Sequence, residues 1–246
     1  MARAQSSVLL GVLSLSIANT TPALAGPPSE GALIPSLGTP FSVPMSENGA
    51  IEALLVGEFD GGFGVDVAWG DGPQLKVGSL ISNINVVPGV IGLSETILEL
   101  DLLVQKGDVS TLVVRTAGSI RLVTVRSENG NDWVLNQTVL AIGVFGEGKR
   151  DGVLVCDVTG DGIDDVITFD QILGSILVYP GLSVGGIATQ PITSPVATKT
   201  LSSFTLTDLD GDGDKDFAGF SSPGGLYPLE GLGNGAFVSF ETPAPP

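Results

Sequence analysis

Two Asp-rich loops, 157–165 and 208–216, contain the residues whose types and spacing could do chemistry. In the second loop, carboxylates occupy positions 1, 3, 5 and 9, and glycine occupies position 6. Alternate residues of a tight loop converge on one point, and glycine permits the φ > 0 turn that directs the position-7 carbonyl inward. Calcium takes about 6–8 oxygen ligands, whereas magnesium prefers a tighter octahedron with more waters. The spacing therefore predicts a calcium site.

The first of these loops keeps the same pattern with one weaker ligand. Positions 1, 5 and 9 are aspartates, and Thr159 stands at position 3. A hydroxyl replaces one carboxylate, so we expect weaker calcium binding at this loop.

A third, degenerate loop lies upstream at 58–66. Glu58 and Asp60 fall at positions 1 and 3, and Asp66 falls at position 9. Gly62 replaces the acid at position 5 and Phe63 replaces the glycine at position 6, so the loop is a doubtful metal site.

Two alternatives to a calcium loop between strands can be weighed. An EF-hand needs a bidentate Glu at position 12, where this chain has Thr168 and Gly219, and it needs flanking helices. The Gly- and Pro-containing flanks favour strands and exclude the EF-hand. A metal-free Asp/Gly turn is the other alternative. Three or four close carboxylates repel one another without a cation, which favours the metal site.

The Asp loops belong to an internal repeat. Segments 154–178 and 206–229 both contain an apolar stretch, an Asp/Gly loop, a second apolar stretch, a Gly turn and a third apolar stretch. Asp161 and Asp212 are 51 residues apart, and Asp66 and Asp165 are 99 apart, close to two periods. Segment 102–123 between them keeps the apolar stretches but lacks the regularly spaced aspartates of the loops. The chain therefore contains four units, at about 51–100, 101–150, 151–203 and 204–246.

Composition predicts an all-β fold. Runs of 4–8 β-favouring residues are bounded by Gly, Pro, Asn and Asp, and 35 Gly and 16 Pro argue against long helices. Segment 94–104 fits either a helix start or the approach to a strand. Units of about four short strands predict a β-propeller of four blades, with five as the alternative. Segment 40–44 resembles 235–240, as in a circle closed across the termini; the other arrangement is an open arc that self-association completes.

These loops and their apolar flanks resemble FG-GAP or VCBS-type repeats, which occur in integrin α-chain propellers and in many exported bacterial proteins. The resemblance implies that each loop joins the first two strands of a blade and holds calcium as a structural clamp, about two ions in all. Integrin-like propellers have seven blades, whereas this chain has material for four or five. The ligands that the resemblance implies are Asp157, Thr159, Asp161, Ile163 (carbonyl) and Asp165, then Asp208, Asp210, Asp212, Asp214 (carbonyl) and Asp216.

The N-terminus has the pattern of a secretory signal peptide. Arg3 precedes the apolar run 8–18, and Ala23-Leu24-Ala25 forms an A-x-A site. We expect export after cleavage at Ala25, to the cell surface, periplasm or medium, and a single domain over 26–246. Cleavage removes one cation and no acid, which changes the formal net charge from −17 to −18. Such a chain repels nucleic acid, and no second stretch approaches transmembrane length.

The chain has no histidine, which excludes Ser-His-Asp triads, Cys-His dyads and histidine-ligated zinc. Its one cysteine, Cys156, is flanked by apolar residues and is interpreted as a small buried hydrophobe. The leading hypothesis is a non-enzymatic binding or adhesion module for an extracellular protein or glycan. The alternatives are a carbohydrate-active enzyme and an envelope structural protein. Trp69 and Trp133 are candidates for sugar stacking or for packing between blades.

Overall fold

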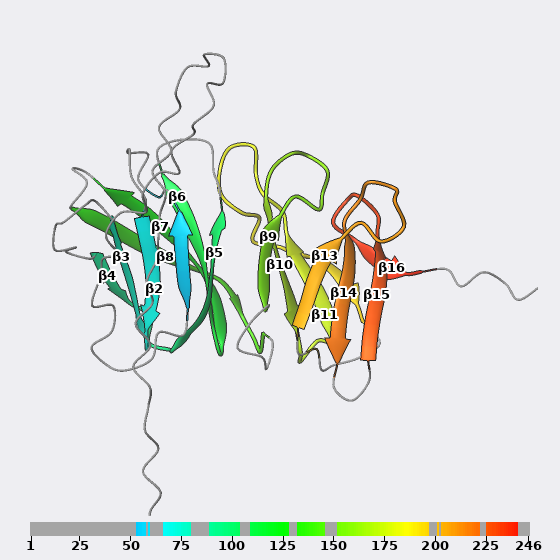
Figure 1. Ribbon diagram of the computed structural model, residues 1–246, viewed down its shortest axis with the longest axis horizontal. Coiled ribbons are helices and arrows are strands. Elements are labelled where there is room, and N and C mark those ends of the chain that lie inside the picture. Colours follow the sequence, from blue (N-terminus) through cyan, green and yellow to red (C-terminus); the bar gives the residue numbers. More distant parts are fainter. Residues whose placement is uncertain are drawn as a thin grey trace, which may run out of the picture. The chain divides into compact units, whose positions relative to one another are not determined.

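The computed structural model describes residues 53–57, 59, 66–79, 89–103, 109–127, 132–145, 152–196, 201, 203–221 and 225–240. These residues form sixteen strands in four sheets of four antiparallel strands (Figure 1). The predicted signal peptide, segment 40–44 and the loop acids Glu58 and Asp60 lie outside the described residues.

Each sheet is formed by four strands that are consecutive in the chain. Sheet 1 comprises β1 (Leu54–Gly57), β2 (Asp66–Asp71), β3 (Gln74–Ser79) and β4 (Gly89–Gly92). Sheet 2 comprises β5 (Ile97–Leu103), β6 (Ser110–Thr116), β7 (Ser119–Ser127) and β8 (Trp133–Ile142). Sheet 3 comprises β9 (Val153–Cys156), β10 (Asp165–Asp170), β11 (Ser175–Tyr179) and β12 (Ile192–Pro195). Sheet 4 comprises β13 (Ser203–Thr207), β14 (Asp216–Ser221), β15 (Gly225–Gly231) and β16 (Phe237–Ser239).

The all-β prediction is confirmed for the described part of the chain, which contains no helix. It therefore holds no helix long and apolar enough to cross a bilayer. The helical alternative for 94–104 is wrong, because β5 begins at Ile97. Ser94 has a φ of 64°, which no α-helix accommodates. β5 also spans the expected boundary between the first two units at 100/101.

Sheets 2 and 3 are apolar on both faces, and each face packs against a different neighbour. In sheet 3, Val166 and Tyr179 belong to a cluster shared with sheet 2, whereas Ile167 and Phe169 belong to a cluster shared with sheet 4. Successive side chains of a strand point to opposite faces, so neighbours along β10 serve different clusters. We call the face toward the following sheet the forward face and the opposite one the backward face.

Three hydrophobic clusters join consecutive sheets in the described residues. One lies between sheets 1 and 2, one between sheets 2 and 3, and one between sheets 3 and 4. In the last cluster, Phe217 stacks on Phe204 at 5.1 Å between ring centroids and meets the edge of Phe237 at 6.0 Å. Trp133 packs against the first cluster, and Trp69 is buried, so neither is an exposed sugar-stacking ring.

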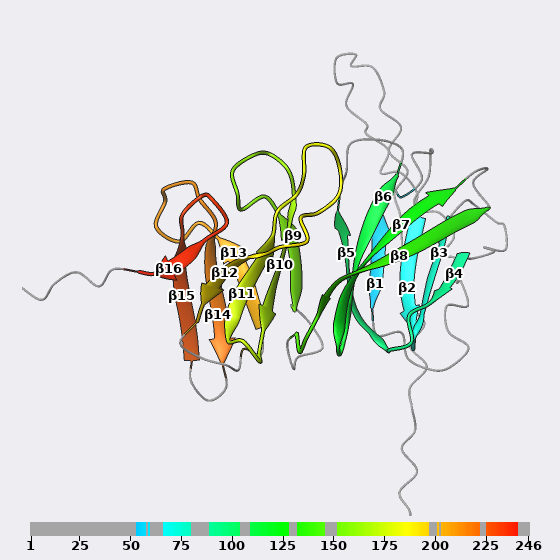
Figure 2. The ribbon, with the colours of Figure 1, turned by 180° about the vertical axis from the view of Figure 1, so that it is seen from behind.

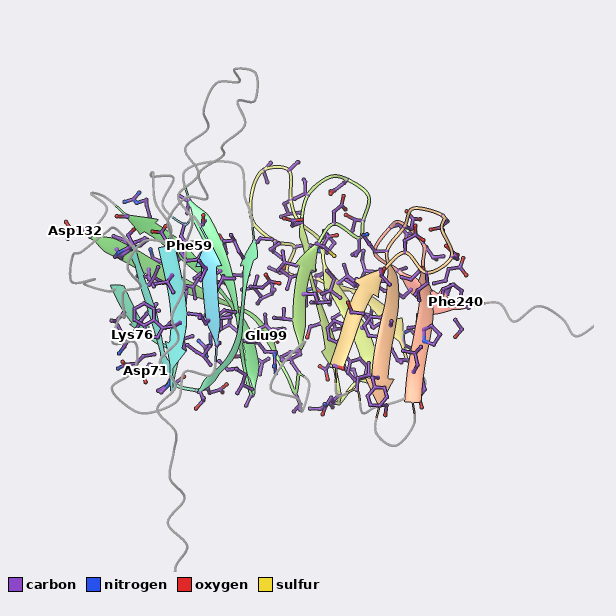
Figure 3. All side chains as sticks on the ribbon, viewed as in Figure 1. Phe59, Asp71, Lys76, Glu99, Asp132 and Phe240 are labelled. Atoms are coloured by element: carbon purple, nitrogen blue, oxygen red, sulfur yellow. The ribbon has the colours of Figure 1, made fainter. Side chains whose placement is uncertain are left out.

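A buried ion pair reinforces the contact between sheets 2 and 3. Arg115 on β6 donates from Nε to Glu99 at 2.7 Å and from Nη1 to the carbonyl of Phe145 at 2.8 Å. Glu99, marked in Figure 3, also accepts hydrogen bonds from the amides of Gly152 and Val153 at the start of β9. A Cβ on Gly152 would lie 2.4 Å from Arg115 Nε, so only glycine lets the guanidinium fill this space.

We predict that Arg115→Ala lowers the free energy of unfolding by about 3 kcal/mol, because it leaves Glu99 without its buried partner. Chemical denaturation measures this loss. Thr138→Ala, at an exposed position on β8 of the same sheet, is the control and should change stability by less than about 0.5 kcal/mol. Equal effects of the two substitutions would contradict the structural role of the pair.

Cys156, at the end of β9, packs against the cluster between sheets 3 and 4. Burial, with smaller contributions from the carboxylates of Asp164 and Asp165, raises the pKa of the thiol to about 11. The thiolate is the reactive form, so the environment makes this cysteine inert at neutral pH.

We therefore expect Cys156 in the folded protein to react with iodoacetamide at pH 8 at least about tenfold more slowly than in the unfolded chain. Mass spectrometry of timed, quenched samples measures both rates. Equal rates before and after unfolding would show that the thiol is neither shielded nor shifted in pKa.

Candidate metal centre

A buried aspartate begins the second strand of sheets 1, 3 and 4. These residues are Asp66, Asp165 and Asp216, each the ninth residue of its predicted loop. All three side chains are almost fully buried at the point where the loop enters the strand. A carboxylate in such a place requires hydrogen-bond donors.

In sheets 3 and 4, these donors come from both sides of the aspartate. Asp165 Oδ2 accepts hydrogen bonds from the amides of Val158 and Thr159, at 2.9 and 3.0 Å, and its Oδ1 accepts one from Gly181 at 2.8 Å. Asp216 repeats the arrangement with the amides of Leu209 and Gly231, at 2.6 and 2.8 Å. Each carboxylate thus ties the beginning of its loop to the chain that leaves the third strand.

Sheet 1 retains this arrangement although its loop sequence is degenerate. Asp66 Oδ2 accepts from the amide of Phe59 at 2.7 Å, and Asp66 Oδ1 accepts from the hydroxyl of Ser79 at the end of β3. The hydroxyl takes the place of the glycine amide in the other sheets. Asp66 therefore has a structural role that does not depend on the other acids of its loop.

The glycines at the end of the third strand are required by close packing. A Cβ on Gly181 would lie 2.4 Å from the carbonyl oxygen of Asp164, and one on Gly231 would lie 2.1 Å from that of Lys215. No side chain fits at such distances. The sequence analysis missed both glycines; the signal for them is a glycine 16 or 15 residues after the ninth aspartate.

The first aspartate of each loop shapes its turn. Asp208 accepts from the amides of Gly211 and Gly213, at 2.6 and 3.2 Å, and Asp157 does the same for Gly160 and Gly162, at 2.7 and 2.8 Å. All four glycines have a positive φ, from 74° to 98°, which side chains beyond glycine rarely adopt. The two loops at 157–165 and 208–216 thus share one backbone conformation, and they lie at the same ends of sheets 3 and 4 (Figures 1 and 2).

Loop 208–216 brings three carboxylates together. One oxygen each from Asp208, Asp210 and Asp216 lies within 4.8 Å of the others. Ligands on opposite sides of a calcium ion are about 5 Å apart, since calcium–oxygen distances are about 2.3–2.6 Å. Both the spacing and the hard oxygen donors therefore fit calcium. Asp212, whose carboxylate accepts from the amide of Asp214 at 2.8 Å, lies outside this group.

Loop 157–165 does not gather its acids in the same way. In the described part of the chain, Asp157, Asp161 and Asp165 form no comparable carboxylate group. Thr159 Oγ1 lies 3.5 Å from Asp165 Oδ1, and Asp161 accepts a hydrogen bond from the amide of Ile163 at 2.9 Å. Thr159 stands where Asp210 contributes a carboxylate in the other loop, so its hydroxyl would replace the third carboxylate at a cation here.

Burial raises the pKa of Asp165 above its ordinary value, and the amides of Gly181, Val158 and Thr159 oppose this shift. A metal binds the deprotonated form, so protons compete with it at this residue. Because the folded-state pKa is raised, the competition begins at a higher pH than for an ordinary aspartate.

Comparisons with family models and with curated proteins give no match to this chain.

We predict that Asp216→Asn lowers the free energy of unfolding by about 1–3 kcal/mol even in the presence of a chelator, because one of the two buried amides loses its acceptor. Denaturant unfolding in chelator measures this value. Asp212→Asn, an exposed acid in the same loop, should change it by less than about 0.5 kcal/mol. A wild-type stability for Asp216→Asn in chelator would contradict the structural role of this carboxylate.

Proposed function

We propose that this chain is an exported calcium-binding β-propeller of the FG-GAP/VCBS type, a binding or adhesion module for an extracellular protein or glycan. The observation that carries the proposal is the convergence of Asp208, Asp210 and Asp216 in a loop closed by a buried carboxylate. The similar backbone of loop 157–165 supports a second, weaker site. Two ions per chain are expected.

Calcium has a structural role in this proposal. Asp208 and Asp210 are exposed and lie close to Asp216, so they repel one another without a cation. The chain already has a formal net charge of −17, which adds to this repulsion. A bound ion would offset the repulsion and clamp the loop between the first two strands of its sheet. Catalysis is not part of the proposal, because the acids that converge belong to this clamp.

The repeated packing of the sheets supports the proposed propeller arrangement. In each consecutive pair, the forward face of one sheet packs against the backward face of the next, as successive blades do. Repeats of this kind bury their apolar faces only against their neighbours. The loops that hold calcium would then rigidify the ends of the blades, and the surfaces between them would be left for a partner.

We predict that native mass spectrometry detects two calcium ions on the wild-type chain and that a chelator removes them. Calcium at about a hundred times its Kd should stabilise the fold by about 2.7 kcal/mol, because the ion binds only the folded state. Asp210→Asn should weaken the site in sheet 4. Asp132 is an exposed acid just before β8 (Figure 3), and the Asp132→Asn chain serves as the control, which should still bind both ions. The absence of bound metal at millimolar calcium would refute the proposed calcium role.

The class of partner is tested separately from calcium binding. A glycan array tests for a glycan partner, and a pull-down from the extracellular fraction tests for a protein partner. Specific retention of a glycan supports a lectin-like module. Turnover of an acidic polysaccharide by the purified chain would replace the binding module with a carbohydrate-active enzyme.

A further inference from the structure

Strand β8 forms one edge of sheet 2 and is the longest strand of the described residues. It has ten residues, whereas β4, β12 and β16, which end the other three sheets, have four, four and three. One side of β8 pairs with β7 (Figure 2). Alternate amides and carbonyls of an edge strand point away from its sheet, so the other side of β8 presents a row of hydrogen-bonding groups.

This other side of β8 has no backbone partner within the part of the chain that the structure describes. No further strand pairs with it, and no backbone hydrogen bond of a turn or loop involves residues 133–142. The four consecutive side chains from Asn136 to Val139 are all exposed. Successive side chains point to opposite faces of a sheet, so neither face is covered at the middle of the strand. Another extended strand can therefore approach this edge.

The sequence of β8 lacks the features that usually block an edge. Natural sheets protect their edges with short strands, charged side chains, proline or bulges. β12 ends at Pro195, whereas the stretch 133–146 contains neither a proline nor a charged residue. The irregularity in the pairing of β8 lies at Leu140, which leaves residues 133–139 in regular register with β7. Seven residues of regular, uncharged edge are therefore available for pairing.

The charge of the chain indicates where two copies can meet. A formal net charge of −17 makes identical chains repel one another. β8 has no carboxylate, and the charged residues of the adjacent β7 are the cations Arg121 and Arg126. Arg121 donates to Gln137 Oε1 at 2.9 Å, so a guanidinium lies on the edge strand itself. Two copies can therefore approach along β8 without bringing carboxylates together.

The regular part of β8 is also complementary to itself. Antiparallel pairing of identical strands about a two-fold axis places one residue opposite its own copy. Full overlap of residues 133–139 makes this residue Asn136, whose amide side chain both donates and accepts hydrogen bonds. The same overlap places Val134 opposite Thr138, a pair of β-branched side chains that favours strand pairing.

We propose that two copies of this chain associate through their β8 strands, which pair antiparallel and join both copies of sheet 2 into one sheet of eight strands. The main-chain groups of the edge require an extended strand as partner. A second β8 supplies one of the same length with complementary side chains. The pairing uses the same surface on both chains, so the assembly stops at two copies.

The mass of the purified chain in solution tests the assembly. We expect twice the mass of one chain by light scattering or sedimentation at about 100 μM, and Asn136→Lys should weaken dimerisation at least about tenfold because it places two like charges opposite each other. Val184→Lys is the control, since Val184 is 91% exposed on a turn outside sheet 2. Circular dichroism confirms that both variants remain folded.

Three results would overturn the proposal: a monomeric wild type, a mass larger than two chains, or equal weakening by the two lysine variants. A monomer would do so whether β8 is then covered by another segment of this chain or by a different protein.

Disulfide formation tests the register and the orientation in a Cys156→Ser background. Opposite residues of antiparallel strands are about 4.5–5.5 Å apart between Cα atoms, which a disulfide can bridge. We expect Asn136→Cys chains to crosslink to one another, and Val134→Cys chains to crosslink to Thr138→Cys chains. Two copies of Val134 would lie about 13 Å apart, so crosslinks between Val134→Cys chains would overturn the antiparallel pairing.

Pairing through β8 uses neither of the two Asp loops, so this proposal and the calcium proposal can fail separately. The mass is measured in calcium and again in chelator, with circular dichroism confirming that the chain remains folded. A dimer without bound metal supports the β8 interface and contradicts the calcium site; a monomer with two bound ions does the reverse.

Discussion

The buried aspartate at the start of the second strand is the constraint on which the loops depend. Its two oxygens accept amide hydrogens from the beginning of the loop and from the end of the third strand, so one side chain fixes three segments at once. Charged acceptors make such hydrogen bonds stronger than neutral ones. The exposed acids of the loop can converge only because this residue already closes the loop from inside. Metal binding would therefore add to an arrangement that the backbone holds without it.

Sheet 2 has no loop with regularly spaced aspartates, and an ion pair connects it to sheet 3 instead. Arg115 occupies the position that Phe169 has in sheet 3, and Glu99 lies opposite it. This pair hydrogen-bonds the carbonyl of Phe145, in the connection after β8, and the amides of Gly152 and Val153 at the start of sheet 3. The same repeat thus uses a buried aspartate in three units and, in the remaining one, an ion pair within sheet 2 that hydrogen-bonds the chain leading into sheet 3. For this reason, sheet 2 packs against sheet 3 although its unit has lost the loop acids.

The sequence was sufficient to predict the strands and their grouping, because the period of 51 residues and the glycine turns mark the same elements in each unit. It also singled out Asp66, Asp165 and Asp216, although as ligands. Their structural role could not be predicted, because it depends on Ser79, Gly181 and Gly231, which lie 13–16 residues away and carry no acid signal. The lack of a three-carboxylate group in loop 157–165, by contrast, was visible in the sequence, because Thr159 stands where Asp210 contributes to the group of the other loop.

The sequence of a repeat does not show which faces of its sheets are exposed. Phe220 and Phe169 occupy equivalent positions and have the same side chain, yet Phe169 is 1% and Phe220 is 49% exposed. An open series of such repeats leaves one face of each kind at its ends, and soluble repeat proteins usually cap these ends with polar residues. Here the last forward face remains apolar, with Phe220, Leu226 and Val238 exposed together. The equivalent face of sheet 3 is buried because sheet 4 packs on it, so exposure depends on the neighbour that a face meets and not on the repeated residues themselves.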